Sequence, residues 1–207
     1  MKYKYYLSLD VSTSNVGIAL WNSDGNLVEL KHLSLNINRK NIDPEYRDLV
    51  KSDLFEDYFK QYKYYIEKDL DGFIDKIIIE APLSNTNVNI NTTALLLGFN
   101  GMARRILYKI FETMPIKISV YDSRKIFLPE FIKQKKRGGV LKNVLSFPKG
   151  WKADEKKKYI WEKVSKLEPN IKWFYKKNGE PKNMCFDMSD AYACGYSQLK
   201  LEGIIRE

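Results

Sequence analysis

Two acidic residues end two runs of the sequence that otherwise have the composition of buried β-strands. Asp10 closes the run that begins at Tyr5, and Glu80 follows three consecutive isoleucines at 77–79. A carboxylate in an apolar strand is costly unless it is paired or bound to a cation. The pattern therefore favours a fold that brings strand ends together with a source of positive charge, and a divalent cation is the simplest such source.

A second pair of acids lies near the C-terminus. Asp187 and Asp190 are three residues apart, so they face the same way on a helix. Four adjacent carboxylates repel one another and raise some of their pKa values, and hard divalent cations remove that repulsion. Two Mg²⁺ ions about 4 Å apart, with Mn²⁺ as a substitute, would suit phosphodiester hydrolysis. Taken singly, each acid also has a simpler interpretation: Asp10 as a turn former, Glu80 as a salt-bridge partner, and Asp187 or Asp190 as a helix cap.

Hydrophobic periodicity predicts the element order β-β-β-α-β-α-β-α, followed by a last helix that carries acids, in an α/β fold. We expect strands at 5–10, 16–21, 27–35, 75–81 and 116–121, and helices at 46–70, 91–111, 153–167 and 188–201. Asp24-Gly25 indicates a hairpin between the second and third strands, because this turn needs a positive φ. The expected sheet has five strands, three antiparallel and then two parallel, with helices on both faces. We expect one domain over residues 1–207, with a basic insertion at about 133–152.

Positive charge is concentrated in one part of the chain. Lysine and arginine total 35 against 26 acidic residues, and residues 133–158 hold ten basic residues and two acidic ones. A basic segment of this kind, which also holds Phe147 and Trp151, favours contact with nucleic acid. The candidate DNA-contacting residues are Lys135, Lys136, Arg137, Lys142 and Lys149, in a segment that we expect to be a loop mobile enough to mould to DNA. The simpler interpretation is a solvated lysine-rich loop.

Several other kinds of site are disfavoured. His32 is the only histidine and falls within an expected strand, which speaks against Ser-His-Asp catalysis and histidine-rich zinc sites. Cys185 and Cys194 lie among small and apolar residues, as packing thiols do in a reducing compartment. No run approaches the roughly 18 apolar residues of a membrane helix, and the N-terminus resembles no signal peptide. These patterns predict a cytoplasmic protein without a membrane partner.

Together, the order of elements and acids resembles the RNase H-like nuclease superfamily, and within it the RuvC-type Holliday junction resolvases. The resemblance spans most of the chain and rests on four segments: Leu9 to Gly17, Ile79-Glu80, Asn91 to Gly98 with Gly101, and Asp187 to Ala193. It implies an RNase H-like fold whose four metal-binding acids fall on Asp10, Glu80, Asp187 and Asp190.

The resemblance also implies further roles. A basic residue after the fifth strand and another at the start of the next helix should lie near the scissile phosphate, which makes Lys125 and either Lys152 or Lys156 candidates. The helix at 92–111 supplies the dimer surface in the family, where Gly98 and Gly101 would allow close approach. Two departures stand out: residues 133–150 form a longer connection than usual, and no aromatic wedge follows Glu80, where Leu83 is the apolar candidate.

The expected function is therefore a Mg²⁺-dependent, crossover junction endodeoxyribonuclease in DNA recombination and repair. A homodimer would resolve four-way junctions by paired symmetric nicks that leave 5′-phosphate ends. The alternatives are a related nuclease acting on flaps, branched DNA or RNA/DNA hybrids, a non-catalytic DNA-binding protein, and an actin-like or sugar-kinase-like ATPase, for whose duplicated domains the chain is too short. Lysine-, asparagine- and tyrosine-rich usage indicates an A+T-rich coding sequence, as in some bacteria, phages and large DNA viruses. The expected setting is the cytoplasm of a bacterium or of a phage- or virus-infected host cell.

Overall fold

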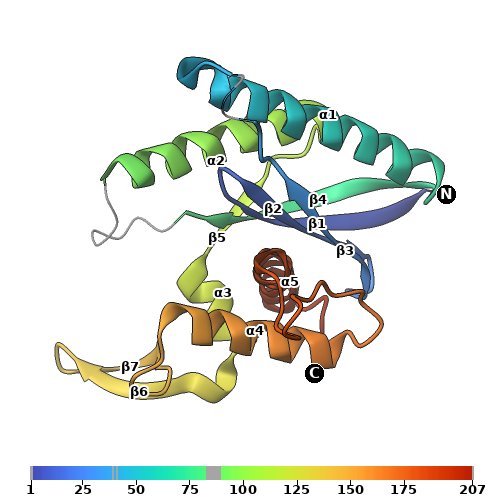
Figure 1. Cartoon of the computed structure of the whole chain (residues 1–207). Helices are drawn as coiled ribbons and strands as arrows, with labels where there is room; N and C mark the ends of the chain where they lie inside the picture. The colour runs from blue at the N-terminus through green and yellow to red at the C-terminus, as the bar shows by residue number, and fades with distance from the viewer. Residues whose placement is uncertain (1, 39, 41, 83–89, 207) are drawn as a thin grey trace.

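The centre of the molecule is a five-stranded mixed sheet with the order β3-β2-β1-β4-β5 (Figure 1). The computed structural model describes residues 2–38, 40, 42–82 and 90–206. Strands β1 (Tyr3–Val11), β2 (Asn15–Asn22) and β3 (Leu27–Ser34) form an antiparallel meander. Strand β4 (Gly72–Ala81) runs parallel to β1, and β5 (Ile116–Ser119) runs parallel to β4. This confirms the predicted sheet of three antiparallel strands followed by two parallel ones.

Helices cover both faces of this sheet (Figure 1). One layer consists of α1 (Arg47–Lys68), which follows a short 3-10 turn at Pro44–Tyr46, and α2 (Ile90–Phe111). The other layer consists of α3 (Val120–Phe127), α4 (Ala153–Leu167) and α5 (Asn183–Leu201). In the described part of the chain, no helix combines the length and the apolar character that a membrane span requires.

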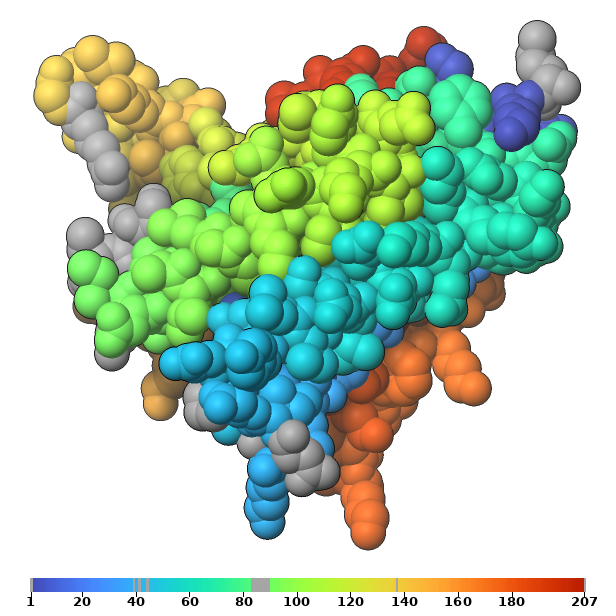
Figure 2. Space-filling model, turned by 90° about the horizontal axis from the view of Figure 1, so that it is seen from above, coloured from blue at the N-terminus to red at the C-terminus, as the bar shows by residue number. Residues whose placement is uncertain are grey.

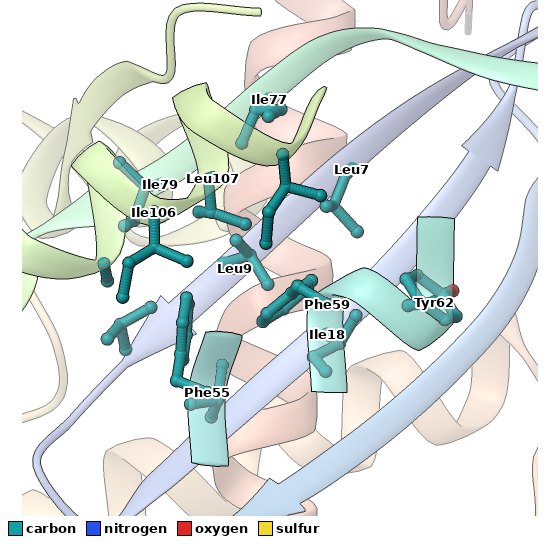
Figure 3. Close-up of a cluster of buried hydrophobic side chains, with 14 of the residues drawn as sticks. Leu7, Leu9, Ile18, Phe55, Phe59, Tyr62, Ile77, Ile79, Ile106 and Leu107 are labelled. Atoms are coloured by element: carbon teal, nitrogen blue, oxygen red, sulfur yellow. The ribbon is translucent and has the colours of Figure 1, made fainter. Parts of the chain in front are cut away.

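The alternation of side chains along the strands builds two separate cores. Ile77 and Ile79 point into the core beneath α1 and α2, whereas Ile78 belongs to the core beneath α5. In the first core, Phe55 and Phe59 of α1 pack against the sheet, together with residues of α2 (Figure 3). This explains why three isoleucines follow one another at 77–79, and it confirms the prediction of a buried strand there.

Helix α5 lies unusually close to the sheet. A side chain at Gly17 of β2 would overlap the backbone carbonyl of Asp187, and one at Gly195 of α5 would overlap the Ser8 hydroxyl. That hydroxyl accepts a hydrogen bond from Trp21 Nε1 at 2.9 Å and donates one to the Ala191 carbonyl, also at 2.9 Å. Because Gly17 and Gly195 have no side chains, α5 can lie directly on β1 and β2.

The structure differs from the prediction most clearly in three places. Helix α3 begins at Val120, inside the run predicted to be strand, because the Ser119 hydroxyl caps it by accepting a hydrogen bond from the Asp122 amide at 3.0 Å. Helix α5 begins at Asn183 rather than at 188. The basic segment is not the mobile loop that we expected: after a 3-10 turn at Pro129–Phe131, it forms a hairpin of β6 (Ile132–Arg137) and β7 (Val140–Leu145).

Candidate active site

Asp10 and Glu80 lie side by side at the carboxyl edge of the sheet. Strands β1 and β4 are parallel neighbours, and their register pairs Leu9 with Ile79, the residues that precede the two acids. The two carboxyl groups are hydrogen-bonded to each other. Asn100 of α2 donates from Nδ2 to the Glu80 carbonyl at 3.1 Å and so holds the end of β4. The shared edge that parallel strands create thus brings together acids that are 70 residues apart in the numbering.

Asp187 and Asp190 complete a cluster of four carboxylates. Both lie in the first half of α5, the helix that rests on the sheet at Gly17. Asp190 is 4% exposed, and its charge acts on both Asp10 and Glu80. The charge of Asp187 acts on Asp10. The structure therefore brings all four sequence-predicted acids to one place.

The cluster holds its protons unusually tightly. Burial, and then repulsion by Asp190 and Asp187, raises the pKa of Asp10 to about 7. Burial, and then repulsion by Asp10 and Asp190, raises the pKa of Glu80 well above its usual range. The hydrogen bond between them lowers the pKa of Asp10 and raises that of Glu80. Burial is also the largest cause that raises the pKa of Asp187, to about 6. The site is therefore short of positive charge.

Arg124 of α3 supplies part of the missing charge. Its Nη2 donates to Asp190 Oδ1 at 3.1 Å. Burial opposes the charge of the guanidinium, but attraction by Asp190 and Glu80 outweighs burial and raises the pKa of Arg124. Its neighbour Lys125, the candidate indicated by the sequence, lies half-buried on the same helix. Whether Arg124 or Lys125 faces the acids depends on where α3 begins. The sequence signal for the start of α3 is Ser119 followed three residues later by Asp122.

A second basic residue, Lys157 of α4, attracts both Asp10 and Asp187. It lies on the side of α4 that carries the buried Ile160 and Val164, at the helical spacing of three and seven residues. The sequence candidates on this helix differ. Lys152 is exposed at the N-cap, and Lys156 Nζ lies 5.5 Å from the centroid of the Phe147 ring. Of these three lysines, Lys157 is the one whose charge acts on the acids.

His32 is a further polar residue at the site. It lies on β3 opposite Gly17, and its Nε2 is 3.7 Å from Asp187 Oδ2. Burial lowers the pKa of His32, so the ring is neutral near pH 7. Both atoms are buried, and neither has a hydrogen-bond partner among the residues that the structure describes. The sequence placed His32 within a strand but did not indicate this contact, because the pairing of β3 with β2 brings His32 to the acids.

An open cleft of about 530 Å³ extends from Asp187. Its lining includes Asn15, Lys157, Lys158, Lys176, Asn183 and Phe186. The lysines come from α4 and from the connection between α4 and α5, and the acids Asp154, Glu155 and Glu180 line the same cleft. Lys176 Nζ lies 3.4 Å from Glu180 Oε2, so part of this positive charge is neutralised, and the cleft reaches Asp187 through a lining of mixed charge.

The remaining sequence candidates lie away from this cleft or outside the described residues. Lys135, Lys136 and Lys142 are exposed on the β6–β7 hairpin, Arg137 ends β6, and Lys149 is exposed between β7 and α4. Leu83, the candidate wedge, lies outside the described residues. The two cysteines are free and buried, as expected of packing thiols.

The four acids suit a hard cation in kind and in charge. All the donors are carboxylate oxygens, three of the acids have raised pKa values, and Asp187 Oδ2 is buried without a partner among the described residues. Within the described ranges, however, no group of three or more His, Cys, Asp or Glu side chains is already arranged to hold a metal ion. Holding Mg²⁺ would therefore require the carboxylates to reorient.

Comparison with known proteins identifies the fold. No protein-family model and no curated protein matches the sequence. Two solved structures are similar over nearly the whole chain. RuvC of Thermus thermophilus is 7% identical, with a TM-score of 0.52 and 96% of both chains covered. T. thermophilus RuvC in complex with a Holliday junction substrate is 7% identical, with a TM-score of 0.54 and 93% of this chain and 91% of that chain covered. The chain therefore has a RuvC-like fold.

Proposed function

We propose that this chain is a Mg²⁺-dependent endonuclease that resolves four-way DNA junctions, within the cytoplasm. The observation that carries the proposal is the cluster of Asp10, Glu80, Asp187 and Asp190, which lies at the edge of a RuvC-like sheet and lacks positive charge. A solved structure with the same fold is bound to a Holliday junction. That complex favours a junction over other substrates, and the clustered acids favour hydrolysis over binding alone.

The residues of the site have different proposed roles: metal binding, positioning of a carboxylate, and phosphate binding. The four acids would hold two Mg²⁺ ions, which would supply an activated water and stabilise the leaving oxygen of the phosphodiester. Arg124 holds Asp190 in place through its 3.1 Å hydrogen bond and keeps that carboxylate aimed at the cluster. Lys157 and Lys158 line the cleft, where they would bind the phosphates that flank the scissile bond. The sequence assigned the same role to Lys125 and to Lys152 or Lys156; we propose Lys157 in place of Lys156, which lies over the Phe147 ring, and Lys125 and Lys152 stay predictions.

A second copy of the chain would dock on the outer face of α1 and α2, the layer that faces the viewer in Figure 2. Leu95 and Leu97 of α2 are 53% and 49% exposed, and no atom of the described residues lies within 4 Å of a Cβ position built on Gly98 or Gly101. A shallow hollow of about 490 Å³ lies beside Gly98. Small residues beside exposed leucines allow two helices to approach closely, and a two-fold dimer would match the symmetry of a junction.

Cleavage of a panel of DNA substrates tests this function. The panel contains a mobile four-way junction, a flap, plain duplex and an RNA/DNA hybrid, each with Mg²⁺ and with EDTA. We expect paired nicks in the junction by the wild type and none by Asp10→Asn, whereas Asp24→Asn, in an exposed turn, should cut normally. Preferred cutting of the flap or the hybrid would favour the alternative substrates, and undiminished cutting by Asp10→Asn would refute the assigned site.

A matched pair of lysine variants tests the cleft. Lys157→Ala should slow cleavage at saturating DNA, because this lysine is the one whose charge reaches Asp10 and Asp187. Lys156→Ala, one position along the same helix, should change the cleavage rate much less, since Lys156 lies over the Phe147 ring. Single-turnover rates would decide, and equal losses in the two variants would contradict the assignment.

A further inference from the structure

The β6–β7 hairpin is an arm with a fixed base. Figure 1 shows it extending away from the sheet beyond α3 and α4, and Figure 2 shows it standing clear of the α1–α2 layer. At the base, the Leu145 amide donates to the Tyr121 hydroxyl at 3.1 Å, and the Ser146 amide donates to the Phe131 carbonyl at 2.8 Å. Four aromatic rings also pack there with centroids 4.9 to 6.0 Å apart: Phe131, Phe147, Trp151 and Tyr159. Strands of six residues extend the arm by about 20 Å.

The arm carries positive charge that its own fold does not neutralise. Lys135 lies directly opposite Lys142, and Lys133 is on the same face two residues away. Residues 132–145 contain no acid. Like charges opposite each other on neighbouring strands destabilise a hairpin, so the ladder favours a polyanionic partner that relieves the repulsion. A two-stranded ribbon also has the width that the major groove of DNA admits.

The tip of the arm combines apolar and basic residues: Val140 pairs with Arg137 and Leu141 with Lys136, so each face of the ribbon ends in an apolar residue beside a basic one. Gly138 and Gly139 have φ values of +56° and +82°, which form a tight turn, and in the part of the chain that the structure describes no atom lies within 4 Å of a Cβ atom placed on either. The next two residues, Val140 and Leu141, are 58% and 65% exposed. Single exposed apolar residues are common on protein surfaces. Two adjacent ones at the far end of a cationic arm need a partner that offers both phosphates and an apolar surface.

We propose that Val140 and Leu141 form an apolar wedge that packs against base faces at the centre of a DNA junction, while Lys135 and Lys142 bind phosphates of the arms. The proposal rests on the proposed function and names the part of the substrate that the hairpin contacts. Apolar side chains make no favourable contact with phosphates, but they pack favourably against bases whose stacking is interrupted. At a branch point, exposing a base face costs least, because the regular stack is already broken there.

Fluorescence of 2-aminopurine tests the wedge. The probe is placed either at the junction centre or in the middle of one arm, and binding is followed in the Asp10→Asn protein. We expect fluorescence to rise at the centre only, and Val140→Ser/Leu141→Ser should abolish that rise and reduce the preference for junction over duplex by about tenfold. Leu201→Ser is the matched control, since Leu201 is 62% exposed at the end of α5. An unchanged signal at the centre in the tip variant would overturn the proposal.

A second variant separates the wedge from the charged ladder. Lys135→Ala/Lys142→Ala should weaken binding to junction and duplex alike and lower the slope of log affinity against log salt by about two, but leave the signal of the bound complex intact. If the tip variant instead changes the sedimentation of the free protein and not the signal, the tip is a contact between copies and the wedge is refuted. A different result would refute the proposed function: no cleavage of branched DNA by the protein with Asp10 intact.

Discussion

Replacement of Asp10 by Asn is expected to stabilise the metal-free protein at alkaline pH while it abolishes cleavage. Burial, then repulsion by Asp190 and Asp187, holds the pKa of Asp10 at about 7 instead of 3.8. A raised pKa means that the folded state binds this proton more tightly than the unfolded state does. Its contribution to stability is therefore complete below pH 3.8 and is lost as the pH rises through about 7.

The size of the effect follows from the gap between the two pKa values. At 1.36 kcal/mol per pKa unit, the difference between 3.8 and about 7 corresponds to about 4 kcal/mol once Asp10 is ionised in both states. For a chain of 207 residues, 1 kcal/mol moves the melting temperature by about 2–4 °C. Asp10→Asn should therefore melt on the order of 10 °C above the wild type in EDTA at pH 8.5. The amide has nearly the shape of the carboxyl group, so little packing is lost.

Thermal unfolding followed by circular dichroism measures this effect. The difference between Asp10→Asn and the wild type should shrink as the pH is lowered toward 4, and Asp24→Asn should show no such trend. Adding Mg²⁺ at pH 8.5 should raise the melting temperature of the wild type but not that of Asp10→Asn. A variant that melts at or below the wild-type temperature in EDTA at pH 8.5 would refute the reasoning that the cluster lacks positive charge.

Three further outcomes are expected. Arg124→Met leaves the buried Asp190 without its ion-pair partner and should lower the free energy of unfolding by roughly 3–5 kcal/mol in urea titrations; an unchanged midpoint would contradict this pairing. Gly17→Ala should destabilise the protein and abolish cleavage, because the new methyl group overlaps the Asp187 carbonyl, whereas Gly98→Ala should keep the melting temperature but weaken the dimer in sedimentation. The affinity for Mg²⁺ in calorimetry should rise with pH between about 6 and 7, since the two carboxyls with these pKa values must lose protons to bind it, and a flat profile would argue against them as ligands.

The strands and the four acids could be predicted because each has a local signal. An apolar run that ends in a carboxylate identified the ends of β1 and β4, and the spacing of three identified the pair on α5. The double glycine at 138–139 was also a local signal, since it joins two short strands. The density of lysines around it led to the prediction of a loop.

The residues that sequence analysis missed depend on relations that are not local. Arg124 reaches Asp190 only because α3 begins at Val120, and Lys157 faces the acids only because of the rotation of α4 about its axis. His32 reaches Asp187 through the pairing of β3 with β2 and the close approach of α5. Sequence periodicity places residues within an element, but it does not give the rotation and the distance between elements.

The contact between Gly17 and the backbone of Asp187 makes the geometry of the acid cluster independent of the stability of the core, although the two often change together. The height of α5 above the sheet is limited by main-chain atoms and not by the size of the side chains packed between them. Exchanges among apolar side chains of the neighbouring core are therefore expected to change the stability of the protein, but not the distances between its carboxylates. A chain built this way can accumulate many substitutions and still keep a RuvC-like fold at 7% identity.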